Sequence, residues 1–171
     1  MTRRRALLVA VVLALAGAAG CSDDDGGSPI DGAPADAAPE PLFPADYASS
    51  YTKVRDCRSS SSHDFHLIVI WADPDAAGPY LDRDADFPVG SVVVKEEFDL
   101  GDTECTGDIV QWSVMQRLEA GTAPDAQLDW LWQKVDENRQ VLTQNESRCF
   151  ACHLDCDGDP ADSYENTCAE P

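Results

Sequence analysis

The chain has 171 residues, of which 32 are acidic and 12 basic, so its formal net charge at pH 7 is −20. A surface this acidic excludes nucleic acids and anionic lipids as partners held by charge. The length suits one ordinary domain with terminal extensions.

Residues 1–20 have the pattern of a signal peptide. Three arginines at positions 3–5 precede an apolar run from Ala6 to Ala19 that only Gly17 interrupts. The run is too short to span a bilayer, so we expect it to be removed on export. The following segment, 18–21, is similar to a bacterial lipobox and predicts a lipidated Cys21; the alternative is ordinary cleavage with a free thiol there. Residue 22 is Ser, whereas Asp at this position commonly retains such lipoproteins at the inner membrane. We therefore expect the mature protein to be anchored at the periplasmic face of the outer membrane, or at the cell surface.

Residues 21–46 contain no Lys or Arg and are rich in Asp, Pro, Ala and Gly. Such a segment cannot bury a core, so we expect a disordered acidic linker behind the lipidated cysteine. The remaining residues, 47–171, form the predicted folded domain.

Short apolar runs and turns alternate within that domain. Four runs have the β-branched content or alternation of strands, and two segments have helical character. We expect strands over 65–72, 91–98, 109–118 and 128–135, a short helix over 75–81, and a polar helix over 137–154. The predicted class is α+β: mainly an antiparallel sheet with a few helices, the C-terminal helix carrying the motif described next.

Cys149-Phe150-Ala151-Cys152-His153 matches C-x-x-C-H, the attachment signature of a c-type haem. Two thiols three positions apart on a helical turn reach the two vinyl groups of one porphyrin, and the next residue supplies the proximal iron ligand. The motif predicts one covalent haem c held by Cys149 and Cys152, with His153 on the iron. The alternative is a disulfide within C-x-x-C in a haem-free acidic lipoprotein.

Once Cys21 and the motif are assigned, four cysteines remain, an even number suited to an oxidising compartment. Three pairings are possible. We favour Cys156–Cys168, which closes a short loop after the haem helix, together with Cys57–Cys105.

Further iron ligands or pocket groups are few. His66 begins the strand over 65–72, on the face of Ile68 and Ile70, and is a candidate distal group, although a strand-end position near solvent is favoured slightly. His63 lies in a serine-rich loop and is expected at the surface. Met115 is expected in the core.

The segment 87–98 resembles the cytochrome P-460 family, β-rich monohaem c-type proteins that include the cytochromes c′-beta. The resemblance rests on Y-x(n)-F-x-x-G-[ST]-x-x-V-K-E, matched here by Tyr80, Phe87, Gly90, Ser91, Val94, Lys95 and Glu96, with Trp112, Met115 and the strand 129–132 farther on. It covers about 50–160 and ends in the C-x-x-C-H motif.

The resemblance implies a function. In the enzymatic branch the lysine of V-K-E is cross-linked to the porphyrin edge and the protein oxidises hydroxylamine; Lys95 holds that position. The branch without the lysine binds nitric oxide and other small gases behind an apolar cap. Alternation alone groups Lys95 with Val93 and Glu97 and fits a surface lysine. The resemblance instead implies that the Lys95 side chain faces the haem.

The expected function is therefore redox chemistry on small nitrogen species such as hydroxylamine or nitric oxide. The alternative is a non-catalytic gas-binding or electron-transfer cytochrome. The expected partners are a small nitrogen-containing substrate or gas, a redox protein, and a membrane through the lipid anchor only. Family members are often dimers, so the resemblance also implies a homodimer.

Overall fold

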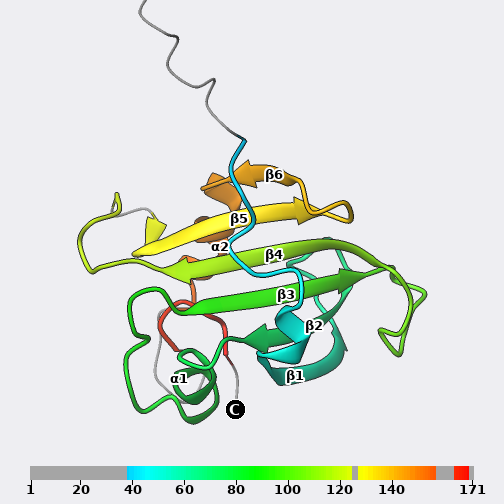
Figure 1. Ribbon diagram of the computed structural model, residues 1–171, viewed down its shortest axis with the longest axis horizontal. Coiled ribbons are helices and arrows are strands. Elements are labelled where there is room, and N and C mark those ends of the chain that lie inside the picture. Colours follow the sequence, from blue (N-terminus) through cyan, green and yellow to red (C-terminus); the bar gives the residue numbers. More distant parts are fainter. Residues whose placement is uncertain (1–37, 125–126, 157–163, 170–171) are drawn as a thin grey trace, which may run out of the picture. The chain divides into compact units, whose positions relative to one another are not determined.

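Six antiparallel strands follow one another in the same order along the chain and across the sheet in the described part of the molecule (Figure 1). The computed structural model describes residues 38–124, 127–156 and 164–169. The strands are β1 (Thr52–Ser59), β2 (Leu67–Ala72), β3 (Val92–Phe98), β4 (Ile109–Arg117), β5 (Trp130–Asp136) and β6 (Val141–Gln144). Each strand pairs only with its neighbours in sequence, so the sheet is a simple meander.

Three short helical elements accompany the sheet: the 3-10 turn η1 (Tyr47–Ser49) and the helices α1 (Ala77–Asp82) and α2 (Ser147–Leu154). The predicted α+β class is confirmed, and α2 carries the C-x-x-C-H motif as expected. No helix among the described residues has the length and apolar character needed to cross a membrane.

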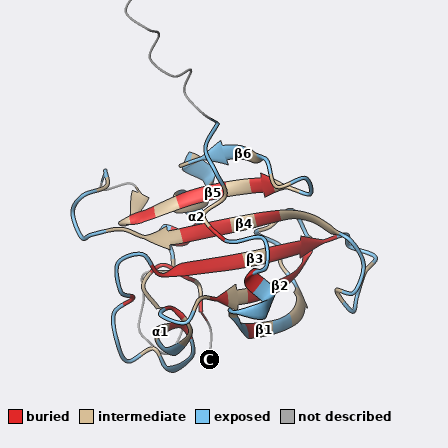
Figure 2. Ribbon diagram, in the orientation of Figure 1, coloured by how far each residue is buried: buried red, intermediate tan, exposed pale blue. Residues whose placement is uncertain are grey.

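The two faces of the sheet bury different sets of side chains because successive residues of a strand point to opposite sides. Figure 2 shows β2 and β3 as the strands that are buried along most of their length. One face packs in a cluster that includes Ile68, Ile70, Val93, Met115 and Trp132. The other packs in a cluster that includes Val92, Val94, Trp112, Val114 and Val135.

An N-terminal segment covers the second face, and it begins earlier than the predicted domain boundary at residue 47. Phe43 is 3% exposed in the second cluster. Gln133 binds the segment twice, accepting from the Leu42 N–H and donating to the Glu40 carbonyl, each at 3.0 Å. Arg139 also donates to the Phe43 carbonyl at 2.7 Å. The prediction that the linker extends to residue 46 is therefore wrong for the segment around Leu42 and Phe43, which packs against the sheet.

Three further expectations are corrected. Strand β1 was not predicted, because its residues alternate poorly between apolar and polar. The central strand begins at Leu67, since Phe65 is 64% exposed with φ 64°. The helix expected over 137–154 is only α2, because residues 141–144 form the edge strand β6, which pairs with β5. The predicted signal peptide, most of the linker and Cys21 lie outside the described residues.

Candidate haem site

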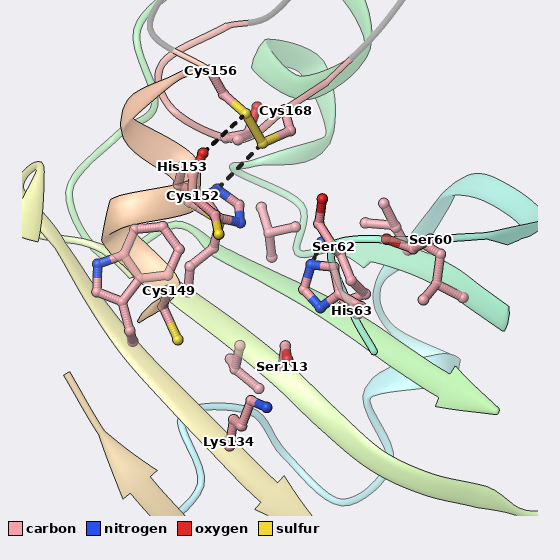
Figure 3. A pocket seen from close by; sticks show the side chains of 18 of the residues that line it. Ser60, Ser62, His63, Ser113, Lys134, Cys149, Cys152, His153, Cys156 and Cys168 are labelled. Atoms are coloured by element: carbon pink, nitrogen blue, oxygen red, sulfur yellow. Dashed lines mark hydrogen bonds between the residues drawn. A yellow bond between two sulfur atoms is a disulfide. The ribbon is translucent and has the colours of Figure 1, made fainter. Parts of the chain in front are cut away.

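Two free cysteines in the described part of the chain lie on α2, beside a cavity of about 350 Å³. Cys149, Cys152 and His153 all line this cavity (Figure 3). Cys152 and His153 lie three and four positions after Cys149, so both lie on the same side of the helix as Cys149. The volume is in the range of small-molecule and cofactor sites.

Helix α2 begins where Asn145 attaches the chain to β5. The Asn145 N–H donates to the Trp132 carbonyl at 2.9 Å, and the Asn145 side-chain oxygen accepts from the Trp132 N–H at 3.1 Å. Asn145 has φ 54°, a left-handed conformation that asparagine adopts more readily than most residues. The Trp132 ring then lies 4.7 Å from the His153 ring, centroid to centroid.

The protonation pattern of His153 suits an iron ligand. Its side chain is buried, and Nδ1 donates to the Asn166 carbonyl. A carbonyl only accepts, so Nδ1 carries the hydrogen and Nε2 keeps the lone pair that would bind iron. Burial, assisted by the charge of Lys95, lowers the pKa of His153 to about 3, so the imidazole is neutral.

A C-terminal strap, residues 164–169, holds the Asn166 carbonyl in place. The Asn166 side chain donates back to the His153 carbonyl at 3.2 Å, and Trp130 Nε1 donates to the Glu165 carbonyl at 3.1 Å. The strap is joined to the end of α2 by the disulfide Cys156–Cys168. The second disulfide is Cys57–Cys105, so both pairs favoured from the sequence are present.

The donor set around the cavity fits a c-type haem. Two adjacent thiols are left out of the disulfides, as thioether attachment requires, and a neutral imidazole follows them. The cavity also has four basic side chains in a strongly acidic protein, which suits the carboxylates that a haem carries. These are Arg58, Lys95, Lys134 and Arg148. The residues present therefore fit the cofactor.

Lys95 lies on the cavity side of β3, in a row of side chains that crosses the sheet. It pairs with Ile70 of β2 and Ser113 of β4, and Ser113 pairs in turn with Lys134 of β5. All four residues line the cavity. Burial lowers the pKa of Lys95 to about 8, although Glu97 acts in the opposite direction.

Of the two upstream histidines, the structure places His63 at the cavity and His66 away from it. His63, predicted at the surface, lines the cavity with its side chain 17% exposed. His66 is not among the described residues that line the cavity; its Nδ1 bonds the Phe98 carbonyl at 3.0 Å. The two histidines differ because Asp64 and Phe65, which lie between them, both have left-handed φ values and turn the chain.

Asp64 also fixes the His63 loop to the rest of the site. Its carboxylate accepts from Arg148 of α2 at 2.6 Å and lies 3.8 Å from Lys134 Nζ of β5. The hydrogen bond from Arg148 lowers the pKa of Asp64. The loop is thereby tied both to the haem helix and to the sheet beneath it.

The large aromatic residues of the sheet divide between its two faces. Trp132 lines the cavity, and Trp130 packs behind it in the same cluster. Trp112 and Phe98 pack on the opposite face. Met115 is 5% exposed, as expected for a core residue, and also lines the cavity.

Sequence reasoning missed His63, Ser113, Lys134 and Glu97 as components of this site. The signal for Ser113 was present, because alternation groups it with Met115, but its neighbours depend on strand register. A loop histidine such as His63 has no periodicity from which its direction can be inferred.

Comparison with known proteins agrees with this site. No curated protein matches the chain by sequence. The family model described as Cytochrome P460 matches residues 44–159, more than half of the chain, and the match includes both the Lys95 segment and the C-x-x-C-H motif. The chain therefore belongs to the cytochrome P460 family, which implies a haem cofactor.

Proposed function

We propose that this protein is an exported monohaem c-type cytochrome that oxidises hydroxylamine or a related small nitrogen species. The haem would be attached through Cys149 and Cys152 with His153 as the proximal ligand, and Lys95 would be bonded to the porphyrin edge. The observation that carries the proposal is that Lys95, on β3, lines the same cavity as all three residues of the haem motif.

When bound, haem supplies an iron that binds the small ligand and accepts its electrons. The chain's own residues attach it, orient the proximal imidazole and line the space around it. That lining includes Lys95, His63 and Ser113, which hold exchangeable protons. Oxidation of hydroxylamine releases protons as well as electrons, so a polar lining favours the enzymatic branch over gas binding behind an apolar cap.

Export and membrane anchoring belong to the same proposal. They are supported by the signal-peptide pattern and by Cys21 in its lipobox-like setting, at the outer membrane or the cell surface. Two disulfides in the folded domain are typical of an oxidising compartment. The net charge favours a redox partner with a basic surface, and the protein would meet the membrane through the lipid alone.

The first test is the absorption spectrum of the ferrous protein matured by the c-haem assembly machinery, together with hydroxylamine consumption. We expect a red-shifted, broadened Soret band that Lys95→Ala converts to an ordinary c-type band with loss of oxidation. The matched control is Lys134→Ala, a second cavity lysine, which should keep the red-shifted band. An ordinary high-spin band in the wild type would contradict the Lys95 bond and favour gas binding.

Two other spectra also contradict the proposal. Sharp low-spin bands would indicate that a protein side chain is the sixth iron ligand and that the protein is an electron carrier. If no haem absorption appeared, the C-x-x-C motif would be a disulfide in a haem-free protein. Lipidation is tested separately by labelling with a fatty acid analogue. The label should be lost in Cys21→Ser, and its retention there would exclude Cys21 as the anchor.

A further inference from the structure

A buried carboxylate lies beside Lys95 on the cavity side of β3. Glu97 is 1% exposed, two positions after Lys95 and on the same face. Its carboxylate accepts from Ser113 Oγ at 2.5 Å, from Gln111 Nε2 at 2.5 Å and from His63 Nδ1 at 3.2 Å. Burial alone would raise the pKa of Glu97, but these three donors outweigh it and lower the pKa, so the group is an anion.

These hydrogen bonds fix the tautomer of His63. An ionised carboxylate can only accept, so Nδ1 of His63 carries the hydrogen. Burial, with Lys95 nearby, lowers the pKa of His63, which keeps the ring neutral and leaves a lone pair on Nε2. Lys95 Nζ is 2.6 Å from that Nε2 and donates to it. These hydrogen bonds therefore connect the Glu97 carboxylate, the His63 imidazole and the Lys95 amine in that order, and the donor of each bond is determined.

We propose that His63, oriented by Glu97, is the base that takes the ammonium proton of Lys95, so that the lysine nitrogen can bond to the porphyrin edge. This inference rests on the proposed function, because it assumes the Lys95 bond. His63 touches the reacting nitrogen and acts directly. Glu97 acts through His63 as a positioning residue that also stabilises the imidazolium, as a carboxylate does behind a catalytic histidine.

The step balances with a peroxide as the oxidant. One N–H bond of the neutral Lys95 amine and one C–H bond of the porphyrin edge are broken, and one N–C bond is formed. Two electrons pass to hydrogen peroxide, which takes up the two released protons and becomes two water molecules. Lys95 must first lose its ammonium proton to expose a lone pair, and His63 Nε2 is the acceptor in place for it.

The second cavity lysine, Lys134, differs from Lys95 in the group that accepts from its amine. Lys134 also lines the cavity, one strand beyond Ser113, but it forms an ion pair with the carboxylate of Asp64 at 3.8 Å. A carboxylate is a much weaker base than an imidazole. Of these two lysines, Lys95 alone is hydrogen-bonded to an imidazole lone pair, so the site selects Lys95 for the bond.

The test follows the bond itself by mass spectrometry. Holoprotein matured without oxygen is treated with hydrogen peroxide, and the fraction of the Lys95 peptide joined to the haem peptide is measured over time. We expect His63→Gln to slow the bond by at least about 100-fold, within the range for loss of a general base. The matched control is His66→Gln, three residues away and outside the cavity, which should form the bond at the wild-type rate.

Two further variants separate chemistry from folding. In His63→Gly, added imidazole should restore the rate, which a merely structural role would not allow. Glu97→Gln should slow the bond and Glu97→Asp should recover part of the rate. Haem attached at Cys149 and Cys152 reports folding in each variant.

The outcomes distinguish the two proposals. If the wild type never forms the Lys95 bond, the proposed role of Lys95 fails and this inference fails with it. If the wild type forms the bond and His63→Gln forms it equally fast, the proposed function stands and this inference is overturned. Slow formation in His63→Gly that imidazole does not restore would also overturn the role of His63 as the base.

Discussion

The disulfide Cys156–Cys168 should influence the haem more than its contribution to stability suggests. It closes a loop with a sequence separation of 12, whereas Cys57–Cys105 has a separation of 48. The entropy lost by the unfolded chain gives roughly 3 kcal/mol for the shorter loop and roughly 4 kcal/mol for the longer one. Replacing each pair by alanines should therefore destabilise the domain more in the Cys57→Ala/Cys105→Ala variant.

The effect on the iron should follow the opposite order. Cys168 follows Asn166, whose carbonyl accepts the His153 Nδ1–H, by only two residues. When the strap is released, that hydrogen bond weakens, the imidazole becomes a poorer electron donor, and the ferric state loses stabilisation. A change of about 1 kcal/mol corresponds to about 40 mV for a one-electron couple, so the reduction potential should rise by that order.

Two measurements on the same holoproteins check this prediction. Urea unfolding gives the free energy of unfolding, and a redox titration gives the potential. The variant lacking Cys57–Cys105 should be the less stable of the two, with a wild-type potential. Equal shifts of the potential in both double variants, or a shift only in the Cys57→Ala/Cys105→Ala protein, would refute the role assigned to the strap.

Two predictions concern tyrosines on the opposite face. Tyr47→Phe should lower the free energy of unfolding in urea by about 1–3 kcal/mol, because it leaves the buried Glu96 and the Trp112 N–H without the hydroxyl that both contact. The haem spectrum should stay the same, and a changed spectrum would contradict the separation of the two faces of the sheet. Burial, with Asp73 nearby, raises the pKa of Tyr51 to about 12. Because the folded pKa lies above the unfolded value near 10, the stabilisation is complete below pH 10 and is lost between about pH 10 and 12. Urea unfolding of Tyr51→Phe should show a smaller loss over that range, and an identical loss would contradict the assignment.

Much of the sheet was predictable because its central strands carry their own signal. β2 is an apolar, β-branched run, β3 begins with three valines, and β4 alternates clearly, so their existence required no tertiary information. The edges were not predictable in the same way. β6 has one half-buried and three exposed residues, and it becomes a strand only because β5 offers it hydrogen-bond partners.

The residues of the candidate site also divide into those that local sequence identifies and those that only the fold brings together. The C-x-x-C-H motif is local in sequence, so the attachment residues were identified without a fold. Lys95 was identified by resemblance, because alternation alone also fits a surface lysine. The remaining groups meet through strand register and loop conformation. Two left-handed residues, Asp64 and Phe65, place His63 rather than His66 at the cavity, and nothing in their local sequence predicts those φ values.

The division between the two faces of β3 is itself testable with neighbouring valines. Val93 is 4% exposed and lines the cavity, and Val94 is fully buried on the opposite face. Replacing either by alanine removes two methyl groups, which costs roughly 2 kcal/mol of hydrophobic transfer before any cavity term.

Both variants should therefore lose similar stability in urea unfolding, because both side chains are buried in clusters of the same sheet. Only Val93→Ala removes atoms from the wall of the haem cavity, so only this variant should change the haem absorption or the affinity for an added small ligand. If Val94→Ala changed the haem as much as Val93→Ala, the sheet would transmit packing changes across its thickness. One face could then not be assigned to the cofactor and the other to the N-terminal segment.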